Sequence, residues 1–379
     1  MTNKNNQNKI QNNIPVKTSW YTGLLDLLSK IKKDKVAFIG LIILILFYVI
    51  SLSADFVAPY SKAYGVRDLT YAPPTKVYII NQKGQLSWPY IYNSDRDFNP
   101  QTFKQEYKED KSTKYYLKFF TTGEPYKILG LIPCNFKLLG VQKGGYLALL
   151  GTDINGRDNF SRLLYGGQVS LTIGFMALFI AFPIGLLYGG ISGYYGGFTD
   201  SVMMRFAETL MSIPSFYLLI TLSIILPDDL SSRERFAFIT VILAFIGWAG
   251  FSRVVRGMVL SIKNYEFVEA SQAMGASSIR TIVKHILPQT ASYVIVAITL
   301  SIPGYILAES GLSFLGLGIQ QPDASWGNML KEAQDYTNVI VRPWLLTPGL
   351  LIFIAVLSFN LIGDAVRDIL DPKSKMRHT

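Results

Sequence analysis

Apolar residues gather in long runs along the chain instead of alternating with polar ones. Six runs approach or exceed the ~20 residues that a helix needs to cross a hydrocarbon layer about 30 Å thick. They cover residues 36–56, 169–195, 203–226, 236–255, 291–315 and 345–362. Inside lipid the backbone has no water to bond, so each run is expected to be a membrane-spanning helix. The alternative is that these runs are buried helices of a water-soluble protein. Six such runs in one chain disfavour this alternative.

Composition agrees with a membrane protein. Half of the 379 residues are hydrophobic and only 16% are charged, against ~25% in soluble domains. The single cysteine, Cys134, excludes an intrachain disulfide. The two histidines, His285 and His378, belong to no cluster with metal-ligand spacing. We therefore expect no metal site in this chain.

The charges of the short loops predict an orientation. Residues 1–35 carry a net charge of +5, residues 253–288 carry +3 and the tail from Arg367 carries +2. Loops 227–235 and 316–343 each carry −1. Because basic loops stay in the cytoplasm, both termini and segment 253–288 are expected there. The long region 58–166 would lie outside despite its charge of +6, since loops of that length are translocated largely regardless of charge.

Residues 58–166 are expected to form a small outer α+β domain followed by an elbow before the second span. Turns are predicted at the Pro73–Pro74 pair, at Gly84 and at Gly123. The runs KVYII (76–80) and KYYLKFF (114–120) predict short strands. Charged residues of the elbow can form a salt-bridged support or serve the transport path, and the first role is preferred; they are Asp153, Arg157, Asp158 and Arg162.

A charged segment broken by glycine separates the fourth and fifth runs. Residues 266–288 read EFVEASQAMGASSIRTIVKHILP. Asn264 is a plausible helix N-cap. Phe267, Ala270 and Met274 fall on one helical face, and Gly275 suits the left-handed position after a helix end.

A second short helix is predicted after that glycine. Ser277 or Ser278 can cap it, and Pro288 suits the first turn of the next membrane helix. Its apolar positions share one face; they are Ile279, Ile282, Val283 and Ile286. Burying three or four such side chains in a partner would contribute roughly 1.5–3 kcal/mol each before ordering costs. The residues alone leave docking onto a partner and contact with lipid headgroups equally open.

The same stretch resembles the EAA loop of ATP-binding cassette (ABC) importer permeases. The likeness rests on Glu269-Ala270-Ser271, Gly275 and Ile286-Leu287-Pro288. Ser271 departs from the family's second alanine, and His285 replaces an apolar residue, as is usual in the peptide/nickel branch. Further segments are similar to the oligopeptide/dipeptide permease C subunit: LLGTDINGRDNFSRLLYGGQVSLTIG (149–174), GISGYYGGFTD (190–200), ESGLSFLGLG (309–318), PDASWGNML (322–330) and FNLIGDAVRDILDP (359–372).

The resemblance implies an all-α integral membrane protein with six transmembrane helices, the type I ABC importer permease fold, in the bacterial cytoplasmic membrane. The expected parts are a cytoplasmic tail (1–35), a first span (36–57), the outer insert and elbow (58–166), a permease core (167–367) that contains a cytoplasmic coupling loop (258–289), and a second tail (368–379).

The implied partners are a homologous B-type permease subunit, two cytoplasmic ATP-binding subunits, an extracytoplasmic solute-binding protein and membrane lipid, with no nucleic acid. The chain lacks a GxxxxGK[ST] phosphate loop. We therefore expect no catalytic role and no cofactor here, and ATP and Mg would be bound by the partner ATPases.

The resemblance also implies residue roles. In such permeases the EAA segment is a coupling helix seated in the ATPase, and ATP-driven closure moves it to switch the membrane cavity between inward and outward access. The expected coupling residues are Glu266, Phe267, Glu269, Ala270, Met274, Gly275, Ile279, Arg280, His285, Leu287 and Pro288.

Three residues in the outer part of the fifth run, Glu309, Ser310 and Phe314, are candidates for the translocation path. Glu309 can instead hydrogen-bond the turn that follows it. Trp326, in the loop after this run, is interpreted as an interfacial anchor.

The branch motif predicts import of oligopeptides or dipeptides. Nickel chelates, glycans and peptide antibiotics are alternatives within the family. An ion-coupled secondary transporter would need ion sites near the midplane, usually on broken helices in internal repeats, and no clear repeat is present. A membrane-anchored scaffold would not need a cytoplasmic segment broken by glycine.

Overall fold

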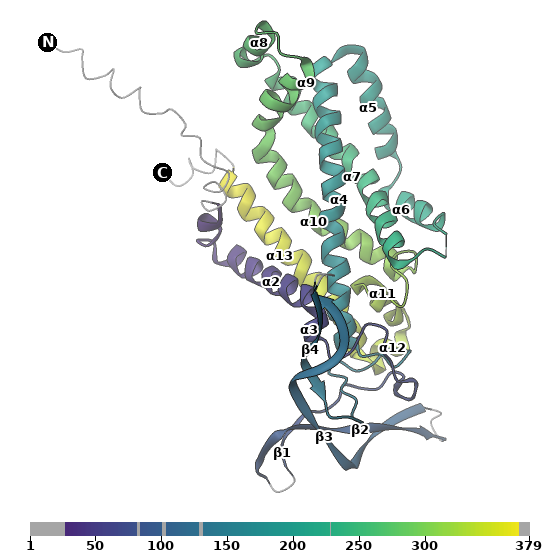
Figure 1. The fold of residues 1–379 in the computed structure, drawn as a ribbon. Coiled ribbons are helices and arrows are strands. Elements are labelled where there is room, and N and C mark those ends of the chain that lie inside the picture. Colours follow the sequence, from purple (N-terminus) through teal and green to yellow (C-terminus); the bar gives the residue numbers. More distant parts are fainter. Residues whose placement is uncertain (1–26, 82–83, 101–103, 129–131, 228, 371–379) are drawn as a thin grey trace, which may run out of the picture.

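The computed structural model describes residues 27–81, 84–100, 104–128, 132–227 and 229–370. These residues form a long helical bundle with a small antiparallel sheet at one end (Figure 1). Most of the two expected tails, residues 1–26 and 371–379, lies outside the described residues.

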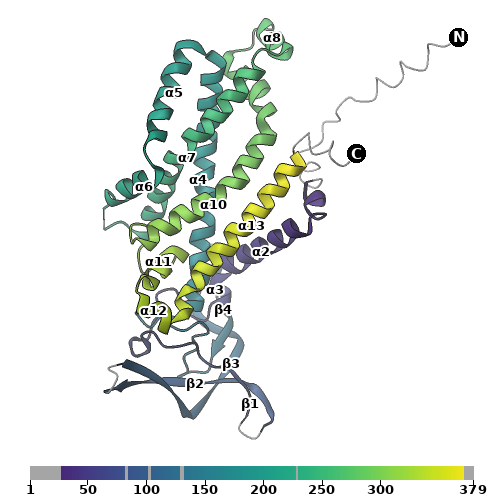
Figure 2. The same ribbon diagram turned by 180° about the vertical axis from the view of Figure 1, so that it is seen from behind.

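Among the described residues, five helices are long and apolar enough to cross a membrane, and there are six candidates if one bent pair counts as a span. Helix α4 packs along α7, and α10 packs on α13, which in turn packs on α2 (Figure 2). The bounds of these helices are α2 (Lys35–Leu52), α4 (Asn159–Tyr195), α7 (Ser232–Ile262), α10 (Ala291–Phe314) and α13 (Thr347–Leu370).

The third apolar run is not one straight helix. The prediction of a single span over 203–226 is corrected by a break between α5 (Gly197–Ser212) and α6 (Ser215–Ile224), which meet at 81°. Pro214 lies at this break and has an extended ψ of 121°. Proline lacks the N–H that would continue the helical ladder, and its ring disfavours a helical residue before it.

Side chains at the helix ends fix where the long helices begin. Asp34 starts α2 by accepting a hydrogen bond from the Val36 N–H at 3.0 Å. Asp158 starts α4 by accepting from the Ser161 N–H at 2.8 Å. A carboxylate at this position satisfies N–H groups that have no partner within the helix.

The sheet has the strand order β1-β2-β3-β4, and every neighbouring pair is antiparallel. The predicted runs at 76–80 and 114–120 fall within or beside its strands. Ile91, Leu117 and Leu147 form its small core. The strands are β1 (Tyr78–Ile80), β2 (Leu86–Asn99), β3 (Lys104–Ile128) and β4 (Ile132–Val141).

The turn prediction holds at Gly84, which has a φ of +75° and donates to the Asn81 carbonyl at 3.0 Å. It is wrong at Gly123, which lies inside β3. A Cβ at this position would lie 2.5 Å from Cδ of Lys137 on the neighbouring strand. The glycine therefore leaves room for a lysine stem and does not make a turn.

Short helices connect the larger elements. Within the described part of 58–166, the only helix before α4 is the 3₁₀ turn η1. The short helices are α3 (Ala54–Val57), η1 (Arg67–Leu69), α8 (Glu266–Ala273), α9 (Ser278–Thr281), the π-helical η2 (Ile282–Ile286), η3 (Leu287–Thr290), α11 (Trp326–Leu330), η4 (Lys331–Gln334), α12 (Tyr336–Val341) and η5 (Pro343–Leu346).

Trp326 is a core residue, which corrects its interpretation as an interfacial anchor. Its side chain is 1% exposed, and its indole N–H donates to the Leu163 carbonyl at 2.9 Å. A Cβ on Gly166 of α4 would approach the ring at 3.1 Å. The small residue on α4 thus makes the space that the indole fills.

Glycines of α4 bring it close to α7. A Cβ on Gly189 would lie 2.9 Å from the Val255 Cβ, and one on Gly193 would lie 2.8 Å from the Arg256 carbonyl oxygen. Small residues at helix contacts are typical of membrane bundles, because close packing drives association where lipid is as apolar as the side chains.

Gly189→Ala is expected to lower the stability of the chain by about 1–3 kcal/mol, since the added methyl group overpacks the α4–α7 contact. The matched control is Gly257→Ala on α7, where no atom lies within 4 Å of the new Cβ. Thermal unfolding in detergent should show a lower midpoint for Gly189→Ala only. Equal midpoints would contradict the close approach of these helices.

Candidate functional site

The segment 266–288 forms the predicted pair of short helices at the end of the bundle opposite the sheet (Figure 1). Helix α8 ends at Gly275, which has a φ of +79°. The Gly275 N–H donates to the Gln272 carbonyl at 2.8 Å, and the Ala276 N–H donates to the Ser271 carbonyl at 3.1 Å. This pair of bonds is a Schellman motif, so the predicted helix stop at Gly275 is confirmed.

The predicted N-cap at Asn264 is wrong by one residue. The N-cap is Tyr265, whose backbone is extended (φ −79°, ψ 146°) and whose side chain makes no capping bond. Glu266 and Glu269 lie in the first turn of α8. Their negative charges suit the positive end of the helix dipole.

Helix α8 turns its apolar stripe away from the rest of the chain. Phe267 is 39% exposed and Met274 is 81% exposed, and Ala270 between them is also exposed. The opposite face is buried, with Val268 at 0% and Ser271 at 2% exposure. The apolar stripe is therefore exposed, whereas the opposite face of α8 packs against the rest of the chain.

The second predicted apolar face is divided between the bundle and the outside. Ile282 and Ile286 are fully buried, whereas Ile279 and Val283 are 52% and 44% exposed. Residues Ile282–Ile286 form a π-helical turn, in which the Leu287 N–H donates to the Ile282 carbonyl, five residues earlier. Of the other predicted coupling residues, Arg280 and Pro288 are exposed, while His285 and Leu287 are half-buried.

One polar contact joins this segment to the end of α4, and others join the ends of α4, α5 and α7 to one another. The Gln272 amide donates to the Tyr194 hydroxyl at 2.9 Å. Asp200 accepts a hydrogen bond from Arg256 Nε at 2.7 Å and another from the Ser192 hydroxyl at 2.5 Å. Sequence reasoning missed Asp200; an acidic residue just before an apolar run was the available signal.

The three candidate path residues lie in the C-terminal part of α10. Glu309 is 0% exposed, and its carboxylate accepts hydrogen bonds from Ser313 at 2.7 Å and from Ser170 of α4 at 3.0 Å. Glu309 is therefore hydrogen-bonded to the turn that follows it, as the alternative interpretation of this residue expected. Ser310 is 6% exposed, and Phe314 is half-buried.

A cavity of about 670 Å³ opens among α4, α7, α10 and α13. Its lining is mainly apolar and includes Phe182, Phe251, Tyr293, Leu300 and Arg367. None of the three candidate path residues is part of this lining. Their role in a path stays a prediction.

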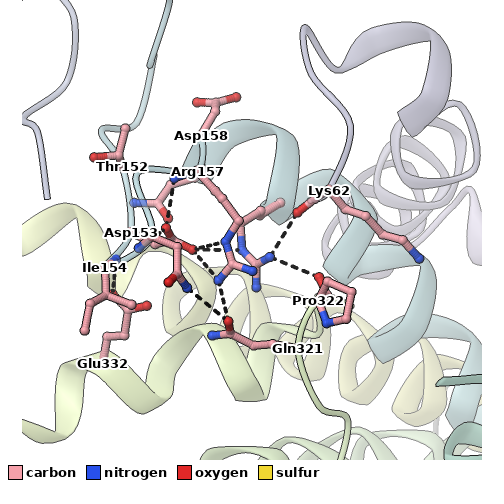
Figure 3. Close-up of polar contacts among 12 residues, drawn as sticks. Lys62, Thr152, Asp153, Ile154, Arg157, Asp158, Gln321, Pro322 and Glu332 are labelled. Atoms are coloured by element: carbon pink, nitrogen blue, oxygen red, sulfur yellow. Dashed lines mark hydrogen bonds and ion pairs between the residues drawn. The ribbon is translucent and has the colours of Figure 1, made fainter. Parts of the chain in front are cut away.

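A buried polar cluster occupies the other end of α4, beside the sheet (Figure 3). Asp153 accepts a hydrogen bond from Arg157 Nε at 2.7 Å and lies 3.4 Å from Arg162 Nε. Arg162 also donates to the carbonyls of Lys62 and Pro322 at 3.1 and 3.2 Å. The salt bridges predicted among these residues are therefore present, and Asp158 caps α4.

Glu332 joins this cluster from the loop after α10. Its carboxylate accepts the Ile154 N–H at 3.2 Å. Burial, followed by the negative charge of Asp153, raises the pKa of Glu332 to about 7. Burial likewise raises the pKa of Asp158 to about 6. Sequence reasoning missed Glu332, because nothing in its neighbourhood along the chain shows that it meets the elbow.

Glu332 predicts a pH-dependent stability. Between its ordinary pKa near 4.5 and about 7, the folded chain holds a proton that the unfolded chain has released. Stability should therefore be greatest at the acid end and fall as pH rises through this window. Glu332→Gln should make the decline shallower, whereas Glu208→Gln, at an exposed glutamate, should not. Unfolding midpoints measured from pH 5 to pH 8 check this, and an unchanged slope in Glu332→Gln would contradict it.

Two family matches cover the bundle but not the sheet. Residues 169–376 match the binding-protein-dependent transport system inner membrane component, and residues 24–74 match the N-terminal transmembrane domain of oligopeptide transport permease C. Segment 75–168, which includes all four strands, lies between the matches.

Curated relatives share the bundle sequence. The chain is 45% identical over 225 residues to the dipeptide transport system permease protein DppC of Bacillus subtilis, covering 59% of this chain and 68% of the relative. It is 43% identical over 226 residues to the oligopeptide transport system permease protein OppC of Haemophilus influenzae, covering 59% and 70%. It is 40% identical over 226 residues to the glutathione transport system permease protein GsiD of Escherichia coli, covering 59% and 72%.

The match over 169–376 spans more than half of the chain and includes the segment 266–288 and the long helices α7, α10 and α13. The similar proteins are permease subunits of ABC transporters. The chain is thus a multi-pass membrane protein that belongs to the family of binding-protein-dependent transport system inner membrane components.

Proposed function

We propose that this chain is the C-type permease subunit of an ATP-driven importer of oligopeptides or dipeptides. The observation that carries the proposal is the family match over 169–376. The matched region includes α8, whose apolar stripe of Phe267, Ala270 and Met274 is exposed. The similar permeases are named for the transport of dipeptides, oligopeptides and glutathione, itself a small peptide. They favour a peptide over the other solutes of the family.

The proposed topology has six spans, with α5 and α6 together serving as the third. Both termini and segment 258–289 lie in the cytoplasm of a bacterial cell, and region 58–166 lies outside as an insert domain. The net charges of the short loops support this orientation. The sheet and the α8 helix lie at opposite ends of the bundle (Figure 1), as this topology requires.

The proposed partners follow from the missing phosphate loop and from the exposed apolar stripe of α8. A homologous B-type permease subunit would complete the membrane cavity, and an extracytoplasmic solute-binding protein would deliver the peptide. Two cytoplasmic ATPases would bind ATP and Mg, because the chain carries no phosphate loop of its own. Specificity would rest largely on the binding protein.

In the proposed mechanism, α8 transmits ATPase closure to the membrane helices. Phe267, Ala270 and Met274 enter a groove of the ATPase, and Glu266 and Glu269 pair with basic groups beside it. The contact made by Gln272 ties α8 to the end of α4, so a displacement of α8 moves α4 directly. The remaining coupling residues, Gly275, Ile279, Arg280, His285, Leu287 and Pro288, shape and support the second half of the loop. Glu309, Ser310 and Phe314 are retained as proposed contributors to the path.

Gly275→Pro and Glu269→Lys are expected to uncouple transport. Proline cannot adopt the φ of +79° found at Gly275, and a lysine at 269 reverses the charge offered to the ATPase. Peptide-stimulated ATP hydrolysis and peptide uptake should fall at least tenfold in liposomes that hold the full assembly. The subunits should still copurify.

Matched changes at the other end of the molecule serve as controls. Gly84→Pro replaces a glycine with a similar φ of +75° in open surroundings, and Asp95→Lys reverses an exposed charge on β2. Both should leave uptake near the wild-type level. Unchanged uptake in Gly275→Pro and Glu269→Lys would sink the coupling role. Absence of peptide-stimulated hydrolysis in the wild-type assembly would count against the peptide substrate.

A further inference from the structure

A row of phenylalanine rings runs from the end of the first span onto the sheet. Phe136 of β4 stacks on Phe56 of α3 with ring centroids 6.3 Å apart, and Phe120 of β3 stacks on Phe136 at 5.9 Å. Phe120 is 60% exposed and Phe136 is 42% exposed. These three residues form the phenylalanine row. Exposed apolar groups that adjoin in this way mark a contact surface.

The β3–β4 hairpin that carries the row is fixed against the outer end of the first span. Lys137 is 3% exposed, and its ammonium group donates to the carbonyls of Ala58 at 3.0 Å and Asp55 at 3.3 Å. Gly123 on β3 leaves the space for the lysine stem. Figures 1 and 2 both show β4 next to α3, which follows the end of α2. The row therefore lies at the level where the chain leaves the membrane.

The row continues an apolar surface that already faces outward from the bundle. Along the last two turns of α2, Ile45, Val49 and Leu52 are 52%, 57% and 56% exposed. Helix α2 is long and apolar enough to cross a membrane, and exposed apolar side chains on such a helix suit contact with lipid. Phe56 follows four residues after Leu52, so the sheet extends the lipid-facing strip with aromatic rings. Aromatic side chains are enriched at the boundary between lipid and water.

The charge of the hairpin also suits a phospholipid surface. Residues 114–141 carry four lysines and one glutamate. Lys118 is exposed two residues before the ring of Phe120. Lysines next to an apolar insertion pair with phosphate groups while the rings sit among the headgroups.

The backbone at Phe120 gives independent support for a role of its side chain. Phe120 has a φ of +54°, in the left-handed region that non-glycine residues rarely adopt and bulky ones least of all. Strained residues of this kind persist where the surrounding structure and function hold them. Glycine would relieve the strain but would remove the exposed ring.

We propose that the paired strands of the β3–β4 hairpin, residues 114–128 and 132–141, rest on the outer leaflet of the membrane that the chain spans, with Phe120 and Phe136 among the lipid headgroups. The inference uses the orientation proposed for the permease only to name the leaflet. The contact with lipid follows from the row itself. The lipid contact would add to the Lys137 bonds that already fix the hairpin against the first span.

Spin labels in the assembled importer test this contact. A nitroxide is placed at Phe120→Cys, and the control label is placed at Phe98→Cys, both in a Cys134→Ser background with cysteine-free partner subunits. Phe98 is 56% exposed and pairs with Gln105 near the other end of β3, so the two sites match in exposure but differ in place. The assembly is reconstituted in liposomes of phosphatidylethanolamine and phosphatidylglycerol.

Collision with oxygen, which concentrates in lipid, is compared with collision with a water-soluble nickel chelate. The ratio of oxygen to nickel accessibility should be several-fold higher at 120 than at 98. Equal ratios would place the hairpin in water, and shielding of position 120 from both reagents would show that protein covers it; either result overturns the proposal. A label on the native Cys134 of β4, which pairs with Tyr126, repeats the measurement with Phe120 and Phe136 intact and should also favour oxygen.

These outcomes are separate from those of the transport assays. Loss of the lipid contact would leave the permease role standing, and a permease for another solute would keep the same hairpin.

Discussion

The close approach of α4 to α7 is the contact on which both ends of the molecule depend. Lipid tails are as apolar as leucine, so apolar side chains alone gain little by meeting another helix inside the membrane. Dense packing is what remains, and the glycines of α4 supply it by admitting the backbone of α7 at Ser252 and Arg256. With this pair fixed, α4 presents Gly166 to the indole of Trp326 and Tyr194 to the loop that follows α7.

Ion pairs join the elements at both ends of the bundle. The Arg256–Asp200 pair closes the end of the bundle near α8, and the cluster around Asp153 closes the opposite end. A buried ion pair is weak support for stability by itself, because removing two charges from water is costly. Its value here is positional: each pair joins elements that are distant in the chain, so each end of the bundle has a defined shape against which a partner can dock.

Much of this arrangement could be predicted from the sequence, and the failures have physical causes. Apolar run length located the long helices, and the helix stop at Gly275 followed from its place after an amphipathic turn. The length of an apolar run does not show whether the helix axis changes direction, so it could not predict the bend at Pro214. Neither Gly123 nor Trp326 could be interpreted from its neighbours in the sequence. Gly123 makes room for the Lys137 side chain on β4, and Trp326 fills the space left by Gly166 on α4. The pairing of Asp200 with Arg256, and of Glu332 with the elbow, likewise depends on contacts between elements that no local pattern contains.

Helix α4 has 37 residues, which at 1.5 Å per residue is a rod of about 55 Å. A bilayer core needs little more than half of that length, so the helix projects from the hydrocarbon layer. One end holds Asp158 and the elbow, and the other holds Tyr194 and α8. A tilt of this rod about its middle moves its two ends in opposite directions, without any rearrangement of the side chains between them. Pro183 lies about two thirds of the way along the helix, where a missing backbone hydrogen bond lets the rod flex. A tilt of α4 in the membrane would therefore move the Asp158 end and the Tyr194 end together but in opposite directions.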